Sequence, residues 1–235
     1  MRRLPIVLVF SSLTLTTILA AAEPTPRTEE DNTFYALGVI ISGNLQTFGL
    51  TARELELVEA GITDGLQDKV SLTDLESYEP KLLALQKTRM AKMTQQAKAA
   101  GAAYRASAAA EQGATRTRSG IVMKTLIAGT GASPAEADQI KVHYTGRFVD
   151  GTLFDSSVAR NSPATFTLTG VIPCWKEALQ LMKVGGKAQI VCPSDRAYGD
   201  EGRPPQIPAG ATLVFEVELL DIVKVGGPEA PGTGK

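Results

Sequence analysis

The chain has 235 residues, a formal net charge of −1, one histidine and two cysteines. One histidine excludes a His-Glu-x-x-His metalloprotease helix and a histidine-rich metal site, and the glycines fit neither the Walker nor the dinucleotide-binding pattern. A net charge so close to zero argues against a nucleic-acid partner. We therefore expect no metal, no cofactor and no nucleic acid.

Residues 1–22 have the order of a secretory signal peptide. Arg2 and Arg3 precede an apolar stretch from Leu4 to Leu19, and alanines follow up to Ala22, after which we expect cleavage. An uncleaved anchor is the alternative, but the stretch is shorter than the roughly 20 apolar residues of a membrane span. No cysteine lies near the cleavage site, which argues against a lipoprotein. We expect export to the periplasm, with enough chain left for more than one domain.

Residues 23–80 predict an all-helical domain. Apolar residues at helical spacing indicate a first helix, and Gly49 supplies its C-terminal stop: Phe34, Leu37, Ile41, Leu45 and Phe48. The capping box Thr51-Ala-Arg-Glu54 opens a second helix, with one apolar side made of Leu55, Val58, Ile62 and Leu66. Thr73-Asp-Leu-Glu76 repeats the pattern and predicts a third helix, which Pro80 should kink or restart.

Residues 81–117 predict a long helix and a linker. Lys81 to Ala110 has no acidic residue and is rich in Ala, Lys, Arg and Gln, with a seven-residue spacing of Leu83, Met90, Ala97 and Tyr104. This composition indicates a long exposed helical stalk. A basic helix also fits nucleic acid or an anionic surface, but no aromatic residue is interleaved apart from Tyr104. A solvated helix face is the favoured interpretation.

The predicted N-terminal helices are short for a domain that stands alone. Two short helices and part of a stalk bury too little apolar surface to be stable by themselves. Pairing with a second copy of the chain supplies the missing burial. We therefore expect a homodimer formed through the N-terminal helices.

A strand is predicted at residues 140–144, where apolar and polar side chains alternate. Ile140, Val142 and Tyr144 therefore share one face, and His143 points to the other. The one histidine is thus turned away from the face that carries Tyr144, which argues against a Ser-His-Asp catalytic arrangement.

Further aromatic and aliphatic side chains are spaced around one acid, as a small-ligand pocket requires. The hairpin-turn signal Asp150-Gly151 leads to Phe154 and Asp155. A short helix then begins at Trp175, and Tyr198 lies in a loop between alanine and glycine. Taken singly, an aromatic residue is more typical of plain core, and Asp155 also fits a turn or a cap.

The two cysteines lie in separate segments of this region. Cys174 adjoins the short helix, and Cys192 ends an apolar-rich strand. Since an exported protein meets an oxidising compartment, we predict a Cys174–Cys192 disulfide. The alternative is two buried thiols that pack as small hydrophobic residues.

Five motifs within residues 118–224 resemble the FKBP-type peptidyl-prolyl isomerases in order and spacing: Val-His-Tyr-Thr-Gly, Gly-Thr-Leu-Phe-Asp-Ser-Ser, Val-Ile-Pro-x-Trp, Ala-Tyr-Gly and Ile-Pro-Ala-Gly-Ala-Thr-Leu-Val-Phe-Glu-Val-Glu-Leu-Leu. The resemblance implies an α+β chain. Its C-terminal antiparallel half-barrel sheet, at residues 118–225, wraps on a short helix and follows an all-α N-terminal domain and the long stalk.

The resemblance also implies the activity. It implies a peptidyl-prolyl cis-trans isomerase that accelerates X-Pro rotation during the folding of exported proteins. The implied substrates are proline-containing unfolded or folding polypeptides, and the implied inhibitors are macrolides of the tacrolimus type.

The family's pocket is carried over residue by residue. The resemblance implies catalytic roles for Tyr144, Phe154, Asp155, Tyr198 and Phe215, and substrate-binding roles for Arg160, Val171, Ile172, Trp175, Arg203 and Ile207. Arg160 fits a solvated surface arginine equally well. Arg203 stands where many members carry histidine, Cys174 where many carry glycine, and Ala164 where eukaryotic relatives carry a further pocket aromatic. We expect the rim of the pocket to be more cationic, and the aromatic surround of the pocket to be shallower on the side of Ala164.

The N-terminal layout is similar to the dimerisation domain of the macrophage infectivity potentiator group, in which two chains interlock and long helices hold the isomerase domains apart. Two alternatives to a purely catalytic protein follow. One is a periplasmic chaperone that holds unfolded chains and whose isomerase activity is secondary, and the other is an interaction factor at the outer surface. Residues 226–235 lack apolar periodicity and predict a disordered tail.

Overall fold

The computed structural model describes residues 28–223, so the expected signal peptide and C-terminal tail lie outside the described residues. Among the helices within this range, none has the length and apolar character needed to cross a membrane. The described chain divides after Ser42 into two units, which are considered separately.

The first unit contains helix α1 (Glu29–Ser42), which has acidic residues in its first turn, where the helix dipole favours them. The expectation of one helix from Phe34 to Phe48 is wrong at its C-terminal end. A turn follows Ser42, and Phe48 belongs to a separate 3-10 helix, η1 (Gln46–Phe48). Gly43 and Asn44 are poor helix formers, which accounts for the break. The stop at Gly49 is confirmed, because this glycine caps η1 with a φ of +53°.

Helix α2 (Ala52–Leu66) begins at the predicted capping box. The Thr51 backbone N–H donates to the Glu54 carboxylate at 2.8 Å, and the Glu54 N–H donates to the Thr51 hydroxyl at 3.4 Å. The second predicted capping box is wrong. The segment forms the 3-10 helix η2 (Glu76–Tyr78), whose Ser77 N–H donates to the Asp74 carboxylate instead.

Helix α3 (Glu79–Ala109) is the predicted long helix, and it starts anew with proline in its first turn, where no intrahelical donor is needed. Near its N-terminal end, Arg89 pairs with Glu54 of α2 at 2.6 Å. Full exposure along the stalk is a wrong expectation, because Gly101 and Ala108 are buried against the C-terminal domain.

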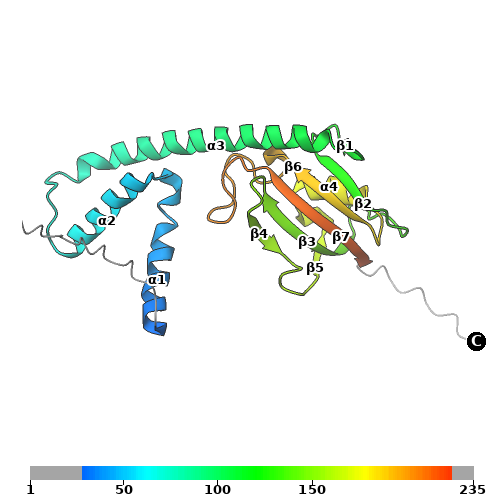
Figure 1. Cartoon of the computed structure of the whole chain (residues 1–235), viewed down its shortest axis with the longest axis horizontal. Helices are drawn as coiled ribbons and strands as arrows, with labels where there is room; N and C mark the ends of the chain where they lie inside the picture. Colours follow the sequence, from blue (N-terminus) through cyan, green and yellow to red (C-terminus); the bar gives the residue numbers. More distant parts are fainter. Residues whose placement is uncertain (1–27, 224–235) are drawn as a thin grey trace, which may run out of the picture. The chain divides into compact units, whose positions relative to one another are not determined.

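The C-terminal domain is an antiparallel sheet packed on a short helix, so the predicted α+β class is confirmed (Figure 1). The strand order is β1-β2-β6-β7-β3-β4, and β5 pairs with β3. The strands are β1 (Ala114–Arg116), β2 (Val122–Ile127), β3 (Gln139–Phe148), β4 (Leu153–Ser156), β5 (Ala164–Thr167), β6 (Lys187–Cys192) and β7 (Leu213–Val223). Gly151 turns the β3–β4 hairpin with a φ of +89°, as the Asp-Gly signal predicts.

The main core lies between this sheet and helix α4 (Pro173–Gln180), which follows the short 3-10 helix η3 (Leu168–Gly170). Ile140, Val142 and Tyr144 of β3 are buried in it, as the alternation predicts. Cys174 of α4 forms the predicted disulfide with Cys192 of β6. The bridge ties the N-terminal turn of α4 to the middle of the sheet, and both cysteines are fully buried.

Candidate active site

A cavity of about 330 Å³ opens between the sheet and the N-terminal end of α4. Its walls come from β3, β4, β5, β7, α4 and the loop after β6. The lining residues are Tyr144, Phe154, Asp155, Phe166, Gly170, Val171, Ile172, Trp175, Tyr198, Arg203 and Phe215. The lining is mostly aromatic and aliphatic, and a single carboxylate belongs to it.

Trp175 is the centre of the aromatic packing. Its ring meets those of Tyr144 and Phe215 edge to face, each at 5.2 Å between centroids, and that of Phe166 at 5.6 Å. Such edge-to-face pairs favour fixed ring orientations. The indole Nε1 is buried and has no hydrogen-bond partner within residues 28–223. The floor of the cavity is therefore rigid and apolar.

Gly146 of β3 leaves space for two aromatic rings of the cavity wall, those of Phe154 and Phe215. A Cβ added at this glycine would lie 2.5 Å from the Phe154 ring and 3.0 Å from the Phe215 ring. The two rings meet edge to face at 5.6 Å. Any larger residue at Gly146 would displace Phe154 from the cavity wall.

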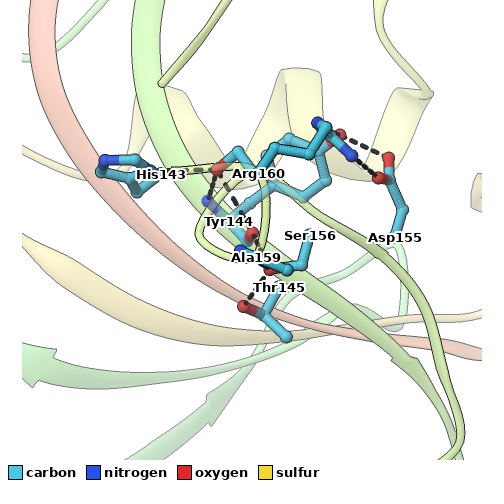
Figure 2. A network of polar contacts seen from close by, with 8 residues as sticks. His143, Tyr144, Thr145, Asp155, Ser156, Ala159 and Arg160 are labelled. Atoms are coloured by element: carbon cyan, nitrogen blue, oxygen red, sulfur yellow. Dashed lines mark hydrogen bonds and ion pairs between the residues drawn. The ribbon is translucent and has the colours of Figure 1, made fainter. Parts of the chain in front are cut away.

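Three polar side chains meet at the edge of the aromatic lining (Figure 2). The Tyr144 hydroxyl donates a hydrogen bond to Asp155 Oδ2, and Arg160 Nη1 pairs with Asp155 Oδ1. Arg160 Nη2 also donates to the Tyr144 oxygen at 3.1 Å. The carboxylate is therefore held from both sides, and its position relative to the cavity is fixed.

The turn that carries Arg160 is fastened to β3 by the serine pair after Asp155. The Tyr144 backbone N–H donates to the Ser157 hydroxyl at 2.8 Å, and His143 Nδ1 lies 3.1 Å from the same hydroxyl. The Ser156 hydroxyl accepts from the Ala159 N–H at 3.1 Å. His143 thus contacts Ser157 of the turn on the face of β3 away from the cavity, as the alternation predicts.

These contacts set the protonation states of Asp155 and Tyr144. Burial alone would raise the pKa of the Asp155 carboxyl, but hydrogen bonds from Tyr144 and Arg160 outweigh it and lower that pKa below its ordinary value. Burial, followed by the hydrogen bond to Asp155, raises the pKa of the Tyr144 hydroxyl. At neutral pH the site therefore contains an ionised carboxylate and a protonated tyrosine.

Two donors at the cavity are free to bind a ligand. Within residues 28–223 the Tyr198 hydroxyl has no hydrogen-bond partner, and the Ile172 backbone N–H is among the unpaired groups that precede α4. Together they provide two hydrogen-bond donors at the cavity.

The structure brings together most of the side chains assigned from the sequence. Nine of them line the cavity: Tyr144, Phe154, Asp155, Val171, Ile172, Trp175, Tyr198, Arg203 and Phe215. Arg160 lies at the edge and pairs with Asp155 of the lining. Ile207 is not among these lining residues: it is buried in the main core with Tyr144, Trp175 and Phe215, and it also borders a separate groove of about 380 Å³ that includes Met90 and Met93 of α3.

Sequence reasoning missed Phe166 and Gly170. Phe166 of β5 packs on Trp175 and on Tyr144. The alternation Ala164-Thr-Phe166 carries the signal that would have found it, because period two puts Phe166 on the same face as Ala164.

Two family models match the chain. Residues 131–220 match the family model described as FKBP-type peptidyl-prolyl cis-trans isomerase, and residues 30–124 match the domain amino terminal to FKBP-type peptidyl-prolyl isomerase. The chain is 41% identical to an Escherichia coli FKBP-type 22 kDa peptidyl-prolyl cis-trans isomerase, over 85% of this chain and 98% of the relative.

Two further relatives match most of this chain. The chain is 32% identical to the outer membrane protein MIP of Legionella longbeachae, over 90% of this chain and 94% of that protein. The crystal structure of FkpA from Escherichia coli superposes with a TM-score of 0.64 at 34% identity, and covers 84% of this chain and 98% of that chain. The chain belongs to the FKBP-type peptidyl-prolyl cis-trans isomerase family, and it is a peptidyl-prolyl cis-trans isomerase.

Proposed function

We propose that the cavity around Trp175 accelerates X-Pro rotation in exported polypeptides by favouring the twisted amide. Rotation about a peptide bond passes a barrier of about 18–20 kcal/mol, because resonance is lost at the twisted geometry. The two X-Pro isomers differ by only about 0.5–1 kcal/mol. A catalyst therefore needs only to bind the twisted form more tightly than the planar forms.

The apolar lining supports this preference. The planar amide carries more charge separation than the twisted amide, so transfer from water into an apolar cavity costs the planar ground state more. The observation that carries the proposal is the edge-to-face packing of Trp175 with Tyr144, Phe166 and Phe215. These rings form a fixed floor that can enclose a proline ring.

The polar groups orient the substrate in this account. Asp155 is an ionised acceptor next to the cavity, and we assign it an electrostatic and orienting role, because isomerisation moves no proton. The Tyr198 hydroxyl and the Ile172 N–H donate to substrate or macrolide carbonyls. Arg160 fixes the carboxylate rather than contacting substrate, since its guanidinium pairs with Asp155 and Tyr144.

The single tryptophan provides a direct binding test. Trp175 is the one tryptophan of the chain, and it lies in the cavity wall. We expect saturable changes in its fluorescence with an X-Pro peptide and with a macrolide of the tacrolimus type, and mutual competition between them. Unchanged fluorescence at millimolar peptide, with an unchanged response to macrolide, would contradict occupation of this cavity.

Export supplies the setting for these substrates. The Cys174–Cys192 bridge fits an oxidising compartment, and the N-terminal residues fit a secretory signal cleaved after Ala22. We place the mature protein in the periplasm. Fractionation of cells should recover it there, starting after Ala22. Cleavage by an added protease on intact cells would instead favour the outer surface and an interaction role.

The N-terminal helices support a homodimer. Helices α1 and α2 contain no buried residue, and several of their large apolar side chains are more than half exposed: Phe34, Tyr35, Leu37, Val39, Ile40, Leu57 and Leu66. Apolar surface on this scale marks a protein–protein contact. A second copy of the chain covers it in the proposed dimer.

Sedimentation tests the dimer. Wild type should sediment as a dimer at micromolar concentration, and Ile40→Asp should shift it to a monomer. Thr33→Asp, on the same helix and exposed, is the control and should stay dimeric. A monomeric wild type would contradict the proposal.

A second candidate function is a holdase, in which the cleft between the two arms of the proposed dimer holds unfolded chains. The two functions separate in refolding assays with the variants Tyr198→Phe and Asp155→Ala. If these variants lose peptide turnover but still protect a refolding client from aggregation, holding is the main activity. If protection falls in parallel with turnover, catalysis is the main activity.

A further inference from the structure

The loop between β6 and β7, residues 193–212, carries Tyr198 and Arg203 of the cavity, and its other side lies against helix α3 (Figure 1). The stalk is therefore in direct contact with a wall of the isomerase site. The contact has two parts, one at each of two glycines.

The first contact is at Gly101, a buried glycine in the interior of α3. A Cβ added at Gly101 would overlap the Thr212 hydroxyl and lie 2.7 Å from Thr212 Cβ. Thr212 is only 3% exposed, and its hydroxyl accepts a hydrogen bond from Arg105 Nη1 of α3 at 2.9 Å. Glycine is a poor helix former, so close approach to Thr212 accounts for its presence at this position.

The second contact is at Gly210, near the C-terminal end of the loop. Its φ is +74°, and an added Cβ would lie 2.7 Å from the Thr94 carbonyl oxygen and 3.3 Å from Lys98 Cγ. Both neighbours belong to α3. Lys98 also pairs with Asp200, so the helix contacts both ends of the segment 200–210.

Backbone hydrogen bonds connect these contacts to Tyr198. The Gly210 N–H donates to the Gly199 carbonyl at 2.9 Å, and Gly199 directly follows Tyr198. The Gly202 N–H donates to the Tyr198 carbonyl at 3.0 Å. A shift of Gly210 away from α3 would therefore move the residue that presents the free hydroxyl to the cavity.

We propose that Gly101 of α3 is a positioning residue for catalysis: its contact with Thr212, together with that of Gly210 with Thr94, fixes Tyr198 over the isomerase cavity. The stalk is thus part of the site as well as a connection between domains. This inference rests on the proposed function of Tyr198 as a substrate hydrogen-bond donor.

The test compares Gly101→Val with Ala102→Val. The two positions are adjacent in α3, and Ala102 is exposed, so the control places the same side chain on the helix away from Thr212. Valine lowers helix propensity at Ala102 but not at Gly101, so a loss confined to Gly101→Val cannot come from helix propensity. Gly101→Val should raise KM for an X-Pro peptide at least fivefold and speed hydrogen exchange of the Gly202 and Gly210 amides at least tenfold. The Val217 amide of β7 should exchange at the wild-type rate. Ala102→Val should match wild type throughout.

A second pair of variants, with a smaller side chain at Gly101, keeps the test valid if Gly101→Val fails to fold. Gly101→Ala should show a smaller shift in the same two quantities, and adding Thr212→Gly should restore them toward wild type, because it removes the atoms that an alanine methyl would meet. Lack of rescue, or equal acceleration of the Val217 amide, would mean a general loss of stability and would overturn the proposal.

Failure of the positioning role differs from failure of the site. Wild-type turnover with an unchanged KM in Gly101→Val overturns the positioning role alone. Absent turnover in folded wild type overturns the role of Tyr198, and therefore this inference with it.

Discussion

The Tyr144 hydroxyl, on β3, donates to the Asp155 carboxylate, on β4, and the two residues lie on neighbouring strands at the edge of an aromatic cavity. Arg160 reaches both residues from the turn after β4. The hydrogen bond joins a side chain of the aromatic floor to the one carboxylate of the lining. Orientation of Asp155 should therefore depend on a hydroxyl that contributes little to packing.

Replacing Tyr144 with phenylalanine keeps the ring and removes this donor. A hydrogen bond to a charged group contributes about 1.5–3 kcal/mol, so we expect kcat/KM for an X-Pro peptide to fall about tenfold or more. Tyr35→Phe, on exposed α1, is the matched control and should not change turnover. Wild-type kcat/KM in Tyr144→Phe would show that Asp155 needs no partner on β3.

The lowered pKa of Asp155 predicts a flat pH profile across the neutral range. The carboxylate is ionised above its native pKa, so turnover should be constant from about pH 8 to pH 5, a range above the ordinary Asp value of about 3.9. Because the native pKa is depressed, this group stabilises the fold above the unfolded-state pKa. The contribution is lost as pH falls through the native value.

Arg160→Met tests the cause of that shift. Removal of the guanidinium should raise the pKa of Asp155, as read by nuclear magnetic resonance titration of its carboxyl carbon. Arg147→Met removes an arginine that bonds the Gly151 carbonyl and should leave the titration unchanged. An equal pKa in Arg160→Met would show that Tyr144 alone holds the carboxylate.

The Cys174–Cys192 bridge closes a short loop with a sequence separation of 18. In the chain-entropy estimate a loop of this size contributes about 3 kcal/mol, so the reduced protein should lose about that much free energy of unfolding in urea. Thiol titration of the unfolded, unreduced chain should find no reactive group. Two reactive thiols, or an equal urea midpoint after reduction, would contradict the bridge or its contribution.

Glu54 couples the start of α2 to α3. Hydrogen bonds from Arg89, and then from Thr51, lower the pKa of Glu54 from 4.5 to about 2. The resulting stabilisation is present above pH 4.5 and is lost as pH falls toward 2. In Arg89→Met the measured pKa of Glu54 should rise toward 4.5, whereas Lys92→Met, at an exposed site of α3, should leave it near 2. A low value in both variants would assign the shift to Thr51.

The cavity could be predicted from the sequence because its residues lie in contiguous motifs. The alternation at 140–144 places Tyr144 inside and His143 outside, and the Asp-Gly turn places Phe154 and Asp155 on the next strand. Phe166 was missed because β5 has only four residues, and so short a strand shows too few alternating positions for the pattern to be recognised.

The packing of α3 could not be predicted in the same way. Its alanine- and lysine-rich sequence is typical of a solvated helix, and nothing local in it shows that Gly101 faces Thr212. Ile207 is buried in the main core, and with Met90 and Met93 of α3 it borders a second groove that its motif does not reveal. Such contacts join residues more than 100 positions apart, so they depend on the tertiary fold.

The most direct test of the account is cis-to-trans isomerisation of a short X-Pro peptide by the purified mature chain, with and without a macrolide of the tacrolimus type. We predict turnover that the macrolide abolishes at a stoichiometry of one per chain, together with a strong loss in Tyr198→Phe. A folded protein without turnover, or turnover that is insensitive to both the macrolide and Tyr198→Phe, would contradict catalysis in the Trp175 cavity.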